Sequence, residues 1–323
     1  MRVHRRTFAA AFAASVLAPA GVLAQETYPS RPVRMLIPYS AGTGPDTLAR
    51  SIVQPAIAAL GGAVFFDNKP AVGGNLALEE LSKAPANGYT VGIATNSLAI
   101  HPGLLKLRFD PLKDFEPIGL VARSGLVLVT RATMTAPDMK GFVATSKAQP
   151  KQLTYSSPGS GSPQHLAMAL MQHVTDTELL HVPYKGSGPA VTAVLAGEVD
   201  CMFMPTHTAA PFVREKRVKA LLVSGKERSA LMPEVPTAAE VGVRGLDVDL
   251  WYALLAPAGT PQDIVKAIQS QVAAVLRNPT IAADLRQRGL EPGLLPDREF
   301  MTLLRSDMHR WAGVIKRSGI VAD

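Results

Sequence analysis

The sequence predicts an α/β fold in which mainly parallel sheets are flanked by helices. Short apolar runs of strand length alternate along the chain with segments whose apolar residues recur at helical spacing. Turns rich in Gly, Ser and Thr connect several of these strands to the helices that follow them. Strands that alternate with helices pair in parallel, because the crossover helix returns the chain to the same edge of the sheet.

The composition is that of an ordinary globular protein. The 323 residues are enough for two domains, with 47% hydrophobic and 18% charged residues. Aromatic residues make up only 6%, which argues against a stacking surface for single-stranded nucleic acid. The formal charge of +7 is not concentrated in a block of basic residues, so we expect no nucleic-acid partner.

The first 24 residues have the pattern of a cleavable export signal. A basic start with Arg2, Arg5 and Arg6 is followed by an apolar middle and by a small-residue cleavage site that ends at Ala24. The Arg5-Arg6 pair also resembles a twin-arginine signal, and both export routes remain open. The apolar stretch is short for a membrane span. Without residues 1–24 the chain carries 30 basic and 26 acidic residues, a net charge of +4.

The cysteine and histidine pattern predicts neither a disulfide nor a metal site. Cys201 is the sole cysteine, so it has no partner within the chain, and its apolar neighbours predict a small buried side chain. His101, His173 and His207 do not stand at metal-ligand spacing from Cys, Asp or Glu. We therefore expect no metal and no cofactor.

In the first half of the chain, apolar runs bounded by turn residues predict strands at 33–38, 63–66, 89–94 and 125–130. A helix is predicted up to Leu60, because Leu48, Ile52 and Ile57 recur at helical spacing. Further helices are predicted over 76–83 and 138–148. The segment 101–113 is rich in turn dipeptides and is predicted as a loop.

The second half repeats the alternation. Pro163 suits the first position of a helix, and Gly197 suits the residue that follows a helix. The predicted strands are 153–156, 179–183, 199–204, 220–224 and 249–256. The predicted helices are 163–173, a helix that ends at Ala196, 208–214, 261–276, 281–288 and 297–317.

Two turns with the same design predict an anion site. Residues 39–43, the first loop, join the first predicted strand to its helix, and residues 159–162, the second loop, do the same in the second half. The backbone N–H groups at each helix start lack intrahelical partners and face the positive end of the helix dipole. The plain alternative for either loop alone is an ordinary tight turn. Asp46, in the first helical turn, is expected to organise the first loop. We expect the two loops together to hold a small carboxylate.

Several longer motifs also occur in order along the chain. They are Pro38-Tyr39-Ser40-Ala41-Gly42, Asp46-Thr47-Leu48-Ala49-Arg50, Asn68-Lys69-Pro70-Ala71-Val72-Gly73-Gly74-Asn75, Gly88-Tyr89-Thr90, His181-Val182-Pro183-Tyr184-Lys185-Gly186, Pro236-Thr237, Trp251-Tyr252, Ala256-Pro257-Ala258-Gly259-Thr260-Pro261, Arg310-Trp311 and Gly319-Ile320. Together they resemble the Bug proteins, the substrate-binding components of tripartite tricarboxylate transporters. The resemblance covers essentially the whole chain after the signal.

The resemblance implies a two-lobed periplasmic-binding-protein fold of type II, the Venus flytrap. Lobe one would comprise residues 25–124 and 249–323, and lobe two residues 125–248. Such a protein would bind a small organic acid in the periplasm as a monomer and deliver it to the membrane permease subunits of the transporter.

The family's binding positions fall on the first and second loops and on three further segments. By this likeness the ligand-binding residues would be Tyr39, Ser40, Ala41, Gly42, Thr43, Thr95, Asn96, Gly159, Ser160, Gly161, Ser162, His165, Tyr184, Lys185, Pro205 and Thr206. Thr43 stands where a second Gly is usual, and Met204 stands where relatives have Asp or another small or polar residue. Both departures bear on ligand preference. Trp251 and Tyr252 are expected to pack at the crossing strands.

Two other functions are alternatives to the receptor. A sensor subunit that reports a ligand to a membrane kinase would use the same site. An exported hydrolase would need a Ser nucleophile near Ser160, but no G-x-S-x-G elbow follows a strand there and no acid–His pair is evident. The sequence therefore favours a binding protein that is not an enzyme.

Overall fold

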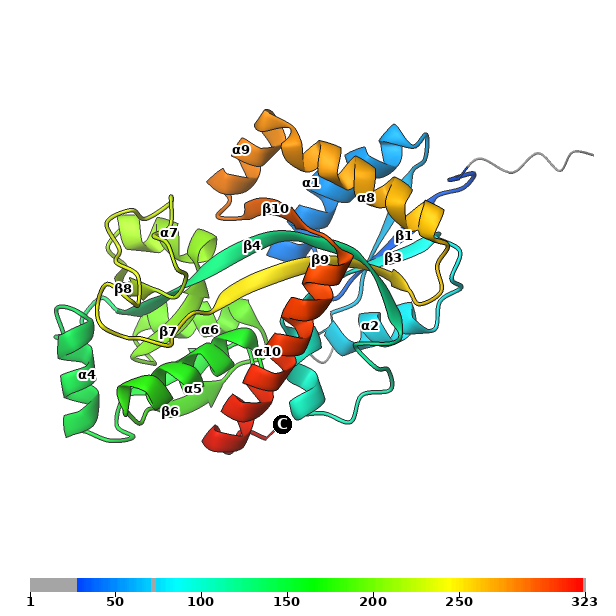
Figure 1. Cartoon of the computed structure of the whole chain (residues 1–323). Helices are drawn as coiled ribbons and strands as arrows, with labels where there is room; N and C mark the ends of the chain where they lie inside the picture. The colour runs from blue at the N-terminus through cyan, green and yellow to red at the C-terminus, as the bar shows by residue number, and fades with distance from the viewer. Residues whose placement is uncertain (1–27, 71–73, 322–323) are drawn as a thin grey trace, which may run out of the picture.

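The computed structural model describes residues 28–70 and 74–321, and it has two lobes connected by long strands that cross between them (Figure 1). The predicted export signal at 1–24 lies outside the described residues. Ten strands in the described part of the chain form one sheet whose main path runs β2-β1-β3-β9-β4-β7-β5-β6, with β8 and β10 paired to β4.

Lobe one is built on three parallel strands. β1 (Val33–Ile37) pairs in parallel with β2 (Val64–Asn68) on one side and with β3 (Thr90–Thr95) on the other. The helices of this lobe are α1 (Gly44–Ala59), α2 (Asn75–Ser82), α3 (Ser97–Ile100), η2 (His101–Gly103), α8 (Gln262–Arg277), α9 (Pro279–Gln287) and α10 (Asp297–Ser318).

Lobe two repeats this arrangement. β5 (Thr154–Ser157) pairs in parallel with β6 (Leu180–Pro183) and with β7 (Cys201–Pro205). The other elements are α4 (Met139–Ala148), α5 (Pro163–Thr175), α6 (Ser187–Ala196), α7 (Thr206–Arg214) and β8 (Val218–Val223). Gly197 follows α6 with φ +78°, so its predicted role as the helix terminator is confirmed.

The connecting strands make the sheet mixed. β4 (Phe115–Arg131) pairs antiparallel with β9 (Asp249–Pro257) and β10 (Glu291–Leu295) along its first part, and with β7 and β8 from Leu126 onward. β9 also pairs antiparallel with β3. The expectation of parallel pairing therefore holds for the strands inside each lobe, and the crossing strands depart from it.

Some predicted boundaries were wrong. The strand predicted at 125–130 begins ten residues earlier, at Phe115, and β10 was not predicted. The first part of β4 was missed because it contains Pro117 and Gly119, which normally interrupt a strand. The strand accommodates both residues because its register with β9 shifts between them. The segment predicted as a loop from residue 101 opens with the short helix η2.

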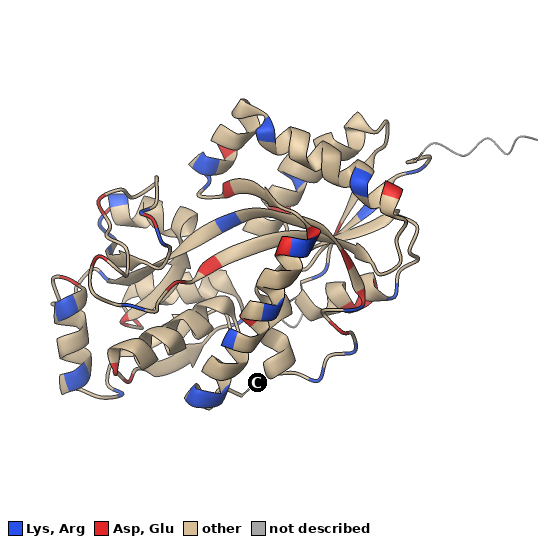
Figure 2. Ribbon diagram, in the orientation of Figure 1, with Lys and Arg blue, Asp and Glu red and all other residues tan. Residues whose placement is uncertain are grey.

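The apolar core continues through both lobes. Trp251 on β9 is 1% exposed, packs edge-on against Phe300 of α10, and donates its indole N–H to Asp307 at 2.8 Å. Cys201 is fully buried and its pKa is raised by burial, which confirms it as a small core side chain. Charged residues of both signs are scattered over the two lobes (Figure 2).

Within 28–70 and 74–321, no helix combines the length and apolar character that a membrane crossing requires. The same residues contain no cluster of three or more His, Cys, Asp or Glu placed to hold a metal ion.

His101 should make the stability of the receptor fold sensitive to acid. Its ring is 5% exposed, Nδ1 lies 2.7 Å from Asn75 Oδ1, and burial lowers its pKa from 6.5 to about 4. Between pH 6.5 and pH 4 the imidazole of His101 is mostly protonated in the unfolded chain and mostly neutral in the folded chain. The free energy of unfolding should therefore fall as pH drops from 6.5 to 4, with a contribution from His101 of about 3 kcal/mol.

Urea denaturation at pH 7, 6, 5 and 4 measures this effect. The variant His101→Gln retains a polar side chain near Asn75 and should lose less stability over the same range. Parallel curves for the variant and the original chain would contradict the assignment.

Candidate functional site

The predicted site residues follow the carboxyl ends of the parallel strands. The first loop follows β1, Thr95 and Asn96 lie at the end of β3, and the second loop and His165 follow β5. Tyr184 and Lys185 follow β6, and Pro205 and Thr206 join β7 to α7. Because β1 and β3 are parallel neighbours in one lobe, and β5, β6 and β7 in the other, each group gathers at one sheet edge.

Asp46 organises the first loop, as the sequence predicted. Its carboxylate is 3% exposed and accepts the Gly42 N–H at 2.9 Å, the Asn68 amide at 3.1 Å and the Arg50 guanidinium at 3.0 to 3.1 Å. Burial raises the pKa of Asp46, but the hydrogen bonds from Arg50, Gly42 and Asn68 outweigh it, and the net pKa lies below its ordinary value. Asp46 is therefore ionised at neutral pH and holds the loop closed on α1.

The start of α1 keeps several donors unsatisfied. Thr43 is the N-cap, but its hydroxyl donates to Ser40 O at 2.7 Å instead of capping the helix. The backbone N–H groups of Ser40, Ala41 and Gly44 find no acceptor among the described residues. Tyr39 anchors the loop to β3, because its hydroxyl lies 2.9 Å from Thr95 Oγ1 and 3.2 Å from Ser97 Oγ. A fixed loop with free N–H groups at a helix start suits an anion.

The second loop is fixed by side chains of its own lobe. Ser162 caps α5 by accepting the His165 N–H at 3.3 Å, and Gly161 donates its N–H to His165 Nδ1 at 3.2 Å. The His165 ring stacks on His181 with 3.8 Å between centroids. Gly159 and Gly161 adopt φ of +138° and +76°, which few other residues tolerate. The Ser160 hydroxyl is half-buried and has no hydrogen-bond partner in the part of the chain described.

The two loops are linked by contacts from neighbouring segments. Tyr39 contacts Thr95, which leads through α3 and η2 to Leu104, and a methyl group placed on Gly161 would lie 2.5 Å from Leu104 Cδ1. Leu104 of lobe one and Gly161 of the second loop are therefore in contact.

The side chains of the other predicted site residues differ in whether they are free to contact a ligand. The Asn96 side chain is buried and bonds twice to β9, donating to Asp249 O at 3.0 Å and accepting the Trp251 N–H at 2.9 Å. The Lys185 side chain is exposed. Thr206 is 2% exposed, and its hydroxyl has no hydrogen-bond partner within the described ranges. Of these three residues, only Thr206 is buried with a polar group that makes no hydrogen bond to the described residues.

Sequence reasoning assigned no binding role to Tyr252 or His207, yet both lie at the start of α1. A methyl group placed on Gly44 would lie 3.3 Å from Tyr252 Oη and 3.9 Å from His207 Cε1. The alternation of β9 directs Trp251 toward α10 and Tyr252 toward the opposite face. That alternation was the available signal for Tyr252, whereas the position of His207 depends on contact between the lobes.

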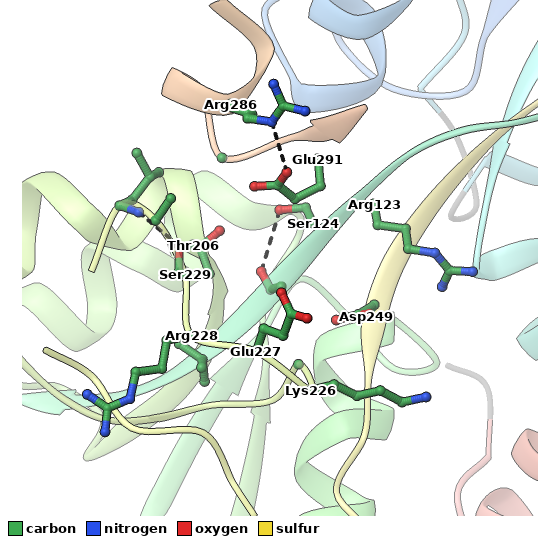
Figure 3. A pocket seen from close by; sticks show the side chains of 16 residues that line it. Arg123, Ser124, Thr206, Lys226, Glu227, Arg228, Ser229, Asp249, Arg286 and Glu291 are labelled. Atoms are coloured by element: carbon green, nitrogen blue, oxygen red, sulfur yellow. Dashed lines mark hydrogen bonds and ion pairs between the residues drawn. The ribbon is translucent and has the colours of Figure 1, made fainter. Parts of the chain in front are cut away.

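A separate cavity of about 370 Å³ lies along β4 and β9 (Figure 3). It is lined by Arg123, Ser124, Asp249 and residues from both lobes, and Thr206 is the only predicted site residue in its lining. Arg286 pairs there with Glu291 at 3.4 Å, and acidic and basic side chains occur side by side. This lining includes no residue of the first or the second loop.

Comparison with known proteins identifies the chain. The family model described as a tripartite tricarboxylate transporter family receptor matches residues 48–320. The chain belongs to this receptor family. The receptor is 29% identical to the protein BugT of Bordetella pertussis, in an alignment that covers 94% of this chain and 95% of BugT. The predicted membership of the Bug family is thereby confirmed, and it implies a periplasmic location.

Solved structures of similar proteins agree with the fold. R. palustris Rpa4515 with adipate matches 92% of this receptor and 100% of its own chain, with 29% identity and a TM-score of 0.84. MatC from Rhodopseudomonas palustris with bound malate matches 89% of the receptor and 100% of its own chain, with 28% identity and a TM-score of 0.78. The predicted two-lobed periplasmic-binding-protein fold is confirmed.

Proposed function

We propose that this receptor captures a small organic carboxylate between the first and second loops and delivers it to the permease subunits of a tripartite transporter. The observation that carries the proposal is the set of free backbone donors at Ser40, Ala41 and Gly44, held in place by the buried Asp46. The Ser160 hydroxyl adds a free polar group from the other lobe.

We assign the ligand a dicarboxylate character. The similar proteins Rpa4515 and MatC were solved with adipate and malate, both of which carry two carboxylates. One carboxylate would occupy the start of α1 and the other would face the second loop, so the acid would bridge the lobes. Such an acid binds the closed arrangement preferentially, and that difference in affinity drives closure.

The proposal assigns the receptor a binding role without catalysis. The hinge would lie where β4 changes partners between Gly125 and Leu126, so lobe one would comprise 25–124 and 249–323, and lobe two 125–248. The receptor would act as a monomer after export.

The expected affinity is micromolar. About five hydrogen bonds to a charged ligand, at roughly 1.5–3 kcal/mol each, offset the costs of association and leave a binding free energy of about −8 kcal/mol.

A thermal-shift panel tests this function. Succinate, malate, adipate, citrate and aspartate at 1 mM are compared with sodium chloride of equal ionic strength. An acid bound with micromolar affinity should stabilise the receptor by about 4 kcal/mol and raise Tm by about 6 °C. If every acid leaves Tm within the range set by sodium chloride, carboxylate binding is rejected.

A further inference from the structure

Tyr252 is a buried residue whose hydroxyl makes no hydrogen bond to the described residues. The side chain is 3% exposed, and burial raises its pKa, so the phenol is neutral. Its Oη ends at the first residue of α1, 3.3 Å from where a methyl group on Gly44 would stand. Buried tyrosine hydroxyls usually find a partner, because an unsatisfied polar group is destabilising. The hydroxyl of Tyr252 is therefore a candidate for contact with a molecule from outside the chain.

His207 approaches the same point from the other lobe. It is the second residue of α7, and its Cε1 lies 3.9 Å from the same position on Gly44. Its backbone N and Cβ also lie within 3.0 Å of where a methyl group on Gly289 would stand, so the residue is inserted between two glycines of lobe one. Nδ1 is buried and has no hydrogen-bond partner in the structure as described. Burial lowers the pKa of His207, which keeps the ring neutral at pH 7.

The start of α1 supplies the third unsatisfied group. The helix has 16 residues, no side chain caps it, and Pro45 at its second position has no N–H. The Gly44 N–H is free. The phenol of Tyr252 and the imidazole of His207 thus approach Gly44, whose own N–H is free, and all three groups can donate. The positive end of the helix dipole disfavours a cation at that point.

We propose that Tyr252 and His207 are specificity-determining residues that hydrogen-bond one carboxylate of the ligand at the start of α1. Tyr252 binds it from the hinge strand β9, and His207 binds it from lobe two, so the contact with His207 forms only when the lobes close. The group recognised there is a carboxylate and not an ammonium. This inference rests on the proposed function, and it adds the residues that select the ligand and couple it to closure.

Calorimetry with malate, succinate, adipate and citrate tests the inference on three single variants. Tyr252→Phe removes only the hydroxyl, and His207→Leu keeps the bulk of the ring without its polar atoms. Each should weaken binding of the acid that the unmodified receptor binds by about tenfold, while Tm of the ligand-free protein does not fall. The matched control is Tyr28→Phe, which removes a hydroxyl that donates to Gly88 O at 2.7 Å. It should lower Tm and leave affinity unchanged.

The double variant Tyr252→Phe/His207→Leu completes the test. Because both side chains address the same carboxylate, their losses in affinity should not be additive. If the unmodified receptor binds an acid and the two single variants bind it equally well, the inference is overturned while the proposed function stands. If the unmodified receptor binds none of the four acids, both are overturned.

Discussion

Replacing Asp46 with Ala should destabilise the receptor by about 3 kcal/mol, because it removes the anion that holds the first loop. The substitution leaves the Gly42 N–H and the Asn68 amide without their acceptor and leaves Arg50 without its partner. Each lost hydrogen bond to a charged group is worth about 1.5–3 kcal/mol, part of which the half-exposed Arg50 recovers from water. Tm should fall by about 5 °C.

Asp263→Ala is the matched control for this prediction. Asp263 also lies in the first turn of a helix, α8, but it is exposed. Its removal should change the free energy of unfolding by less than about 1 kcal/mol. Urea denaturation of both variants measures the two changes in the free energy of unfolding. Equal changes would show that the hydrogen bonds around Asp46 contribute no more than a surface charge.

Ser160→Trp should abolish carboxylate binding and preserve the fold. Ser160 lies between Gly159 and Gly161 in the second loop, and its hydroxyl makes no contact that the fold requires among the described residues. An indole there would occupy the space between the loops, so affinity measured by calorimetry should fall at least about 100-fold, or about 2.7 kcal/mol.

Ser318→Trp gives the comparison for the Ser160 variant. Ser318 is exposed at the end of α10, in a helix whose other end carries the packing against Trp251. The same substitution there should leave both Tm and affinity unchanged. An unchanged affinity in Ser160→Trp would remove the second loop from the binding site.

The sequence could predict the loops because their signal is local. A strand, a turn of small residues and a helix start occur within 33–60 and again within 153–173, and the carboxylate of Asp46 sits in the first helical turn where it can close its own loop. Alternation of strands and helices then places such turns at one edge of each half-sheet.

The features that escaped prediction depend on tertiary context. The first part of β4 contains Pro117 and Gly119, which normally interrupt a strand, and only the shifted register with β9 accommodates them. Tyr252 was expected to pack at the crossing strands with Trp251, and both are buried in the core, but the position of the Tyr252 hydroxyl at the start of α1 was not predicted. His207 reaches α1 only because the lobes meet. No local pattern encodes that contact.

The most direct measurement is a crystal structure of the receptor with malate or adipate, using the acid that raises Tm more. The account predicts one carboxylate about 3 Å from the free N–H groups of the first loop and the other end of the acid against the second loop. An acid bound elsewhere, for instance in the cavity beside Arg123, or two loops that face separate surfaces, would contradict it.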